Sequence, residues 1–195
     1  IKVTYANMSN SREFLQFVGH GDNDYITFNQ IYTYNKKRKK LNCINSFNTN
    51  ASYQNEIVAA DKNYVTIHNS DQPAEVGWIS WNIPYKYSKG KLVAATTSTT
   101  TVKSLIANNK KDKYSKYFAK NQFVTAKKLT FYNGSKVAYT VPKGKVVTLT
   151  KLSLSKDVIY LQFKYGKKTG WAHVNGTKYN FSKPWFQGVN ARLAG

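Results

Sequence analysis

The chain has 195 residues, of which 41% are hydrophobic and 15% aromatic, so it can form one or two folded domains and is not disordered, collagen-like or a coiled coil. Its 30 Lys and Arg outnumber nine Asp and Glu, and the formal net charge of +21 favours an anionic partner. The sequence contains no run of about 18 apolar residues, so it predicts no membrane-spanning helix.

The positive charge is uneven along the chain. Residues 1–95 carry 11 basic and seven acidic residues, a net +4, whereas residues 96–195 carry 19 and two, a net +17. Only three of the basic residues are Arg, the residue that forms bidentate hydrogen bonds to nucleic-acid bases. The hydrated ammonium group of Lys is better suited to a diffuse polyanion. We therefore expect polyanion binding mainly in the second half.

The first half opens with a predicted helix at residues 11–18 (SREFLQFV), which has Ser and Asn available as N-caps and Gly19 at its end. After a basic turn at residues 36–40, strands are predicted at residues 51–60, 63–69 and 76–81. Residues 94–101 (AATTSTTT) are interpreted as a linker.

The second half repeats this scheme. A helix is predicted within residues 101–118, and polar and apolar residues then alternate over residues 145–154 and 157–165, which indicates strands. Turn residues separate the strands at 133–134 (Asn-Gly), 142–144 (Pro-Lys-Gly), 166–168 and 175–176. Short strands joined by such turns predict a small barrel.

Internal similarity supports two modules. Residues 25–35 (YITFNQIYTYN) align with residues 123–133 (FVTAKKLTFYN), and Gly77-Trp78 aligns with Gly170-Trp171, each pair roughly one hundred residues apart. Tyr-rich tails follow both copies. The predicted fold is mostly β, with two tandem SH3-like small barrels at residues 1–95 and 96–195, each preceded by a short helix.

The segments VTAKKLTFYNG, PKGK and YLQFKYGKKTGWAHVNG within residues 97–182 resemble the cell-wall-binding region of lactobacillus surface-layer proteins. More loosely, they resemble bacterial SH3-like and GW-dipeptide wall-targeting modules. Residues 9–88 resemble these modules more weakly, because the middle at 42–54 is longer and the acidic Asp71 and Glu75 precede Gly77.

The resemblance implies a noncatalytic, secreted module with two wall-binding repeats. Such a module holds a Gram-positive surface-layer protein on the cell wall without a covalent bond, by binding teichoic acid or another anionic or neutral wall polysaccharide. The lattice of the full-length protein is then expected to assemble through regions outside this chain.

Hydrated cations and flat rings are the side chains that such a polymer requires. The candidate phosphate ligands are Lys127, Lys128, Lys143, Lys145, Lys164, Lys167 and Lys168. We expect exposed rings for stacking on sugars at Trp81, Tyr85, Tyr165 and Trp185, whereas the repeated Trp78 and Trp171 are interpreted as structural, packed inside each barrel.

Signals of catalysis are weak in the sequence. His20, His68 and His173 lack metal-ligand spacing, no GxSxG motif is present, and Asp112 and Asp157 are the only acidic residues of the second half. The single Cys43 cannot form an internal disulfide and is expected to be buried. We expect no enzyme activity, no cofactor and no metal.

Two alternatives remain open at this point. The chain is also compatible with a wall-targeting module of a phage lysin or an adhesin. Single-stranded nucleic-acid binding is the other alternative, because 29 aromatic residues and a charge of +21 also suit stacked bases and phosphates. The scarcity of Arg and the absence of a known reader motif argue against it.

Overall fold

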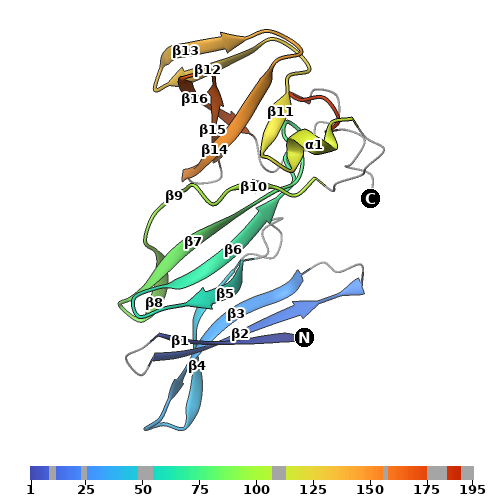
Figure 1. Ribbon diagram of the computed structural model, residues 1–195. Helices are drawn as coiled ribbons and strands as arrows, with labels where there is room; N and C mark the ends of the chain where they lie inside the picture. The colour runs from blue at the N-terminus through green and yellow to red at the C-terminus, as the bar shows by residue number, and fades with distance from the viewer. Residues whose placement is uncertain are drawn as a thin grey trace. The chain divides into compact units, whose positions relative to one another are not determined.

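The computed structural model describes residues 1–8, 12–22, 26–47, 55–106, 113–155, 158–174 and 184–189. These residues are mostly β, as predicted, and form antiparallel sheets with one short helix (Figure 1). The elements are β1 (Lys2–Met8), β2 (Arg12–His20), β3 (Ile26–Asn35), β4 (Lys40–Ser46), β5 (Glu56–Ala60), β6 (Val65–Asp71), β7 (Ile79–Ser88), β8 (Lys91–Ala94), β9 (Ser98–Thr99), β10 (Lys103–Ser104), α1 (Ser115–Phe118), β11 (Gln122–Val124), β12 (Leu129–Asn133), β13 (Lys136–Val141), β14 (Val146–Ser155), β15 (Val158–Tyr165) and β16 (Lys168–Val174).

The chain divides into two compact units. The first unit comprises Ile1–Ser70 with Asn82–Thr96, and the second comprises Asp71–Trp81 with Thr97–Gly195. A boundary at Thr96 lies inside the predicted linker, although Ser98 and Thr99 of that segment form β9 and pair with β14. Gly77 and Trp78 belong to the second unit.

The first unit is built from two sheets that share a core. One sheet has the order β1-β2-β3-β4, and in the other β5, β6 and β7 are neighbours, with β8 paired to β7. Apolar side chains from both sheets form one buried cluster: Ala6, Met8, Phe14, Ile31, Ile57, Val65, Ile67 and Leu92. The burial of this cluster is the main favourable contribution to the folding of the unit.

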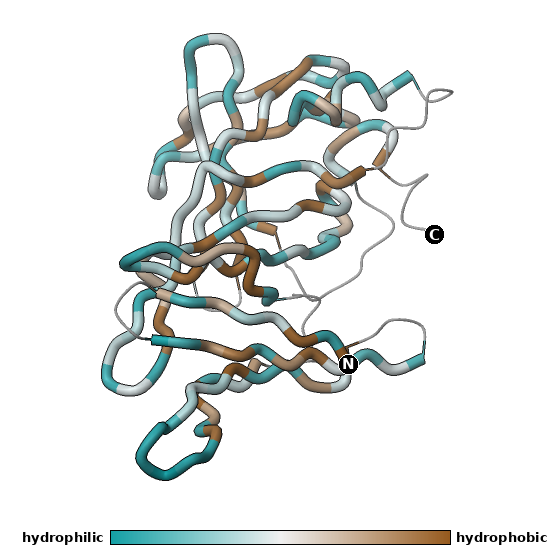
Figure 2. Tube along the Cα trace, turned by 60° about the horizontal axis from the view of Figure 1, so that its bottom comes forward, coloured by the Kyte–Doolittle hydropathy of each residue, from teal (hydrophilic) through white to brown (hydrophobic). Residues whose placement is uncertain are grey.

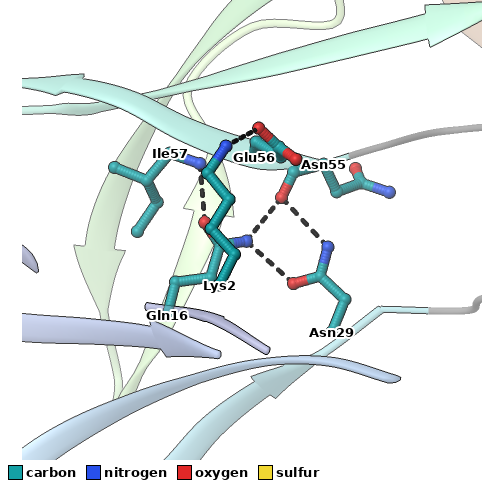
Figure 3. A network of polar contacts seen from close by, with 6 residues as sticks. All are labelled: Lys2, Gln16, Asn29, Asn55, Glu56 and Ile57. Atoms are coloured by element: carbon teal, nitrogen blue, oxygen red, sulfur yellow. Dashed lines mark hydrogen bonds and ion pairs between the residues drawn. The ribbon is translucent and has the colours of Figure 1, made fainter. Parts of the chain in front are cut away.

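A buried polar network also joins the two sheets (Figure 3). The Gln16 side chain is fully buried, and its Nε2 donates to Asn29 Oδ1 at 2.8 Å and to the Asn55 carbonyl at 2.6 Å. Its Oε1 accepts the Ile57 backbone N–H at 2.7 Å. Beside the network, Lys2 Nζ forms an ion pair with Glu56 Oε2 at 2.5 Å. Gln16 thus fixes the start of β5 against β2 and β3.

The helix predicted at residues 11–18 is wrong, because residues 12–20 form strand β2. The segment resembles a helix in sequence because its apolar residues fit both a helical spacing and the alternating spacing of a strand. In the structure Phe14, Gln16 and Val18 point into the core, whereas Leu15 and Phe17 lie half-buried on the other face. An isolated helix of two turns is marginal. Pairing with both β1 and β3 satisfies the backbone of this segment instead.

The second unit contains a seven-stranded sheet in which β11-β14-β15-β16-β12-β13 are successive neighbours. The strands predicted at 145–154 and 157–165 are confirmed as β14 and β15, and Ile159, Leu161 and Phe163 are buried as the alternation requires. The turns predicted at 133–134, 142–144 and 166–168 connect strands of this sheet, while 175–176 lies outside the described residues.

The second predicted helix is much shorter than expected. Of residues 101–118, only Ser115–Phe118 are helical among those described, and Lys103 and Ser104 form the short strand β10. In the first half, β5 falls within the predicted strand at 51–60, and β6 overlaps the strand predicted at 63–69 but continues to Asp71. β7 begins three residues later than predicted, at Ile79, and continues to Ser88.

The segments that align in the sequence adopt different structures. Residues 26–35 form the single strand β3, whereas residues 122–133 form β11 and β12, separated by a bend that contains Lys127 and Lys128. Gly77 lies outside the strands with a φ of 72°, whereas Gly170 lies within β16. The sequence similarity therefore does not extend to these local conformations.

The core of the second unit depends on a glycine. A Cβ on Gly170 would lie 2.9 Å from Phe131 Cβ and 3.0 Å from Tyr139 Cε1, so only glycine allows these rings to approach β16. The rings of Phe131 and Tyr139 stack with centroids 5.0 Å apart, and the Tyr139 hydroxyl donates to the Phe163 carbonyl at 2.6 Å. Burial raises the pKa of Tyr139 to about 12.

Replacing Tyr139 by Phe is expected to lower the free energy of unfolding by about 1 kcal/mol at neutral pH, because the bond to Phe163 is lost. The raised pKa favours the neutral phenol in the folded state, so its contribution is complete below the unfolded pKa of about 10 and declines as pH rises towards about 12. Urea titrations at pH 8 and pH 11 measure the difference between the two proteins. It should shrink at pH 11, and a constant difference would contradict the assignment.

Candidate functional site

One face of the second unit's sheet carries a band of aromatic and polar side chains. Backbone register places Tyr132 of β12, Trp171 of β16, Gln162 of β15 and Lys151 of β14 in one row across four strands. Side chains alternate between faces along a strand, so residues two positions away share this face. The next row contains His173, Tyr160, Ser153 and Ser98.

Five residues of these rows line a groove of about 690 Å³: Tyr132, Trp171, His173, Tyr160 and Ser153. Tyr132 and Tyr160 retain 42% and 37% of their surface exposure, so their rings are accessible to a ligand. The residues that line the groove are Thr130, Tyr132, Gly134, Ser135, Ser153, Tyr160, Trp171, Ala172, His173 and Trp185. Aromatic rings and hydroxyl groups therefore line the same open surface.

Contacts between neighbouring side chains hold the groove in shape. The rings of Tyr160 and His173 lie 6.1 Å apart at an interplanar angle of 52°, and Lys151 Nζ lies 6.0 Å from the centroid of the Trp171 ring. The Ser98 hydroxyl donates to the Ser153 hydroxyl at 2.9 Å. The groove thus offers flat apolar faces and hydroxyls, and the ammonium group of Lys151 lies next to one of its rings. A sugar with a nearby anionic group requires this chemistry.

Trp185 connects this groove to a basic bend. Its backbone carbonyl accepts the Ala126 N–H at 2.8 Å, and its N–H donates to the Glu75 carbonyl at 3.0 Å. Thr125 and Phe186 form a β-bridge beside it. Because Lys127 and Lys128 immediately follow Ala126, the basic bend begins where Trp185 is anchored.

A second basic turn is tied to the same place by Thr125, which is fully buried. The Thr125 hydroxyl donates to the Pro142 carbonyl at 2.7 Å and accepts the Lys145 N–H at 3.0 Å, while the Gly144 N–H donates to the Thr125 carbonyl at 2.9 Å. These bonds bring together four exposed candidates, which we call the basic cluster: Lys127, Lys128, Lys143 and Lys145.

The remaining candidates lie around the β15–β16 turn. Lys164, Lys167 and Lys168 are exposed there, and Lys164 occupies the same face of β15 as Tyr160 and Gln162. The Asn133 side chain of the neighbouring β12–β13 turn donates to the Thr169 carbonyl at 3.5 Å. Tyr165 is half-buried and stacks on Tyr139 with centroids 6.3 Å apart, so one of its faces is already covered.

Several predicted exposures are wrong. Trp81 is only 1% exposed and Tyr85 packs against the core of the first unit, where burial raises its pKa, so neither offers a free ring. Trp78 is 45% exposed instead of packed inside a barrel, and Trp171 is half-buried and lines the groove. Cys43, expected to be buried, is exposed.

The sequence reasoning did not identify Tyr132, Tyr160, His173 and Lys151 as parts of a site. A signal for Tyr160 was present, because the alternation over residues 157–165 separates it from the buried residues. The contributions of Tyr132 and Lys151 depend on which strands are neighbours, and the order β12-β16-β15-β14 does not follow the order of the chain.

The charge of the second unit reinforces the site. Its complete sequence contains 19 basic and four acidic residues, a net +15, against +6 for the first unit. Among the described residues, no three potential metal ligands gather, and no helix is long and apolar enough to cross a membrane. Comparisons with known protein families, curated proteins and solved structures gave no match.

Proposed function

We propose that this protein holds an exported Gram-positive surface-layer protein on the cell wall by noncovalent binding of teichoic acid or another secondary wall polymer. The observation that carries this proposal is the aromatic groove of the second unit beside its basic cluster. In such a polymer, sugars and phosphates occur along one chain. The groove and the cluster match these two groups in adjoining places.

The chemistry of each part supports a division of labour. Tyr132, Tyr160 and Trp171 present rings on which sugar C–H groups can stack, and the hydroxyls beside them accept and donate hydrogen bonds. Lys127, Lys128, Lys143 and Lys145 are exposed ammonium groups that can approach successive phosphates while they remain hydrated. No bond is broken in this interaction, so the proposed role is attachment and not catalysis.

We further propose that each unit is a small SH3-like barrel. Register shifts between paired strands support this, because bulges bend an antiparallel sheet. They occur between β3 and β4 at Ile31/Tyr32, between β12 and β13 at Phe131/Tyr132, and between β14 and β15 at Leu149/Lys151. The surface-layer context, the secreted location and the lattice outside this chain follow from the sequence resemblance alone.

Purified wall sacculi test the proposed partner. The protein should bind untreated sacculi and lose most of that binding after acid extraction of the teichoic acid. Retention of binding after an extraction that removes all secondary wall polymers would show that the ligand is a component that remains, such as the peptidoglycan, and would contradict the proposal. If the protein stays bound to single-stranded DNA above about 0.3 M salt and does not bind sacculi, nucleic-acid binding is its function instead.

The basic cluster supplies a sharper test. The triple variant Lys127→Gln/Lys128→Gln/Lys143→Gln should reduce the slope of log affinity against log salt by about 2, which is on the order of tenfold in affinity between 50 and 200 mM salt. Its control removes three exposed charges elsewhere in the second unit, as Lys103→Gln/Lys116→Gln/Lys120→Gln. Equal losses in both variants would show that only net charge matters.

A further inference from the structure

The hairpin formed by β3 and β4 in the first unit carries a second concentration of positive charge. Its turn joins Asn35 to Lys40, and the five consecutive residues Lys36, Lys37, Arg38, Lys39 and Lys40 are all exposed. We call these five residues the basic tip. The sequence from 26 to 47 contains no Asp or Glu, so the hairpin supplies no carboxylate to neutralise it.

Local contacts close the turn that carries the basic tip. The Arg38 N–H donates to the Asn35 side-chain oxygen at 3.0 Å, which ties the middle of the turn to its first residue. Lys39 adopts a left-handed conformation with a φ of 50°, and Lys40 pairs with Asn35 to begin β4. Five cationic side chains therefore extend from one short turn, and this concentrates positive charge more than lysines scattered over a surface do.

An apolar hollow of about 440 Å³ lies on one face of the same hairpin. It is lined by Phe17, Phe28, Gln30, Tyr32 and Leu41, and the Phe17 and Tyr32 rings meet edge to face at 5.5 Å. Leu41 directly follows the basic tip and pairs with the exposed Tyr34. Figure 2 shows the hydrophilic loop of this hairpin with hydrophobic segments of the strands behind it.

We propose that the basic tip is a second binding site, for the phosphate groups of an extended phosphodiester polymer, and that the hollow receives a sugar substituent of the same chain. The identity of the polymer rests on the proposed function, whereas the site itself rests on the first unit alone. Charge complementarity selects a polyanion, and the adjoining Tyr32, Tyr34 and Phe17 rings select one that carries sugars.

A flexible polymer is favoured over a flat anionic bilayer for a physical reason. Both units pair exposed basic turns with aromatic surfaces, at the tip and hollow in the first unit and at the basic cluster and groove in the second. A polymer can engage both sites whatever their separation, provided that it is long enough. Binding at one site then raises the effective concentration at the other, which increases avidity without any new contact.

The test uses the full chain and a soluble synthetic glycerol phosphate oligomer, titrated between 50 and 200 mM salt. The tip variant Lys36→Gln/Lys37→Gln/Lys40→Gln should lower the slope of log affinity against log salt by about 2, on the order of tenfold over this range. The matched control Lys62→Gln/Lys86→Gln/Lys91→Gln removes three exposed lysines of the same unit and should change the slope by less than half as much.

The outcomes separate the hypotheses. Equal salt slopes for the tip variant and its control would overturn the inference. It would also be overturned if the tip variant lost binding to phosphatidylglycerol vesicles while its binding to the oligomer stayed intact, because the ligand of the tip would then be a bilayer. If the tip variant loses oligomer affinity although neither the tip nor the basic-cluster variant alters binding to sacculi, the tip site stands and the wall-attachment function fails. If only the basic-cluster variant loses affinity, the function stands and the tip site fails.

Discussion

Replacing Gln16 by Leu is expected to lower the free energy of unfolding of the first unit by about 3 kcal/mol. Leucine matches the approximate size of glutamine but cannot accept the Ile57 N–H or donate to Asn29 and Asn55. Each buried polar group that loses such a partner costs about 1 to 3 kcal/mol, and the apolar gain of leucine offsets only part of this. Because Gln16 joins β2 to β5, the loss also loosens the two sheets of the unit.

Urea unfolding followed by far-ultraviolet circular dichroism measures this change, and hydrogen exchange at the Ile57 amide reports the lost bond directly. All four tryptophans lie in the second unit, so their fluorescence follows that unit. The control is Gln30→Leu on the neighbouring strand, where the side chain faces outward and accepts only the Tyr32 hydroxyl among the bonds described; we expect a change within about 0.5 kcal/mol. Equal effects of the two substitutions would show that the network contributes little.

The alternating segments were the most predictable part of the fold. Residues 158–165 bury every second side chain, and that pattern alone predicts both β15 and the outward position of Tyr160. The turns at Gly134 and Gly144 were predictable for a similarly local reason, because both glycines adopt positive φ values of 61° and 81°.

Prediction failed where distant partners decide the local structure. Residues 12–20 carry apolar side chains on both faces, so their periodicity does not distinguish a strand from a helix, and pairing with β1 and β3 decides the outcome. Trp78 and Trp81 were misassigned for a related reason. Trp78 immediately precedes β7 and Trp81 lies within it, and only the packing of their unit determines that Trp81 is buried and Trp78 exposed.

The proposed polymer interaction has two components that respond differently to salt. Attraction between ammonium groups and phosphates weakens as salt rises, because binding releases condensed counterions. Stacking of sugars on rings buries apolar surface and is nearly insensitive to moderate salt. Substitution in the basic cluster should therefore change the salt slope, whereas substitution in the groove should change affinity by a constant factor.

The double variant Tyr132→Thr/Tyr160→Thr is accordingly expected to weaken binding to wall sacculi by about 2 kcal/mol, or about thirtyfold, at every salt concentration. Both rings are exposed on the groove, and threonine retains a hydroxyl and the strand preference of the position. Isotherms on sacculi at 50 and 200 mM salt provide the measurement. Unfolding curves of the variant establish that the second unit remains folded.

The matched control is Tyr5→Thr/Tyr64→Thr, which removes two rings of similar exposure from the first unit. It should alter affinity by less than twofold, because neither ring lines the groove or the hollow beside the basic tip. If the groove variant binds as tightly as the unmodified protein, the rings make no contact with the polymer and the attachment is purely electrostatic. If its loss of affinity disappears at 200 mM salt, the two tyrosines act through the charged surface around them, and the stacking role is excluded.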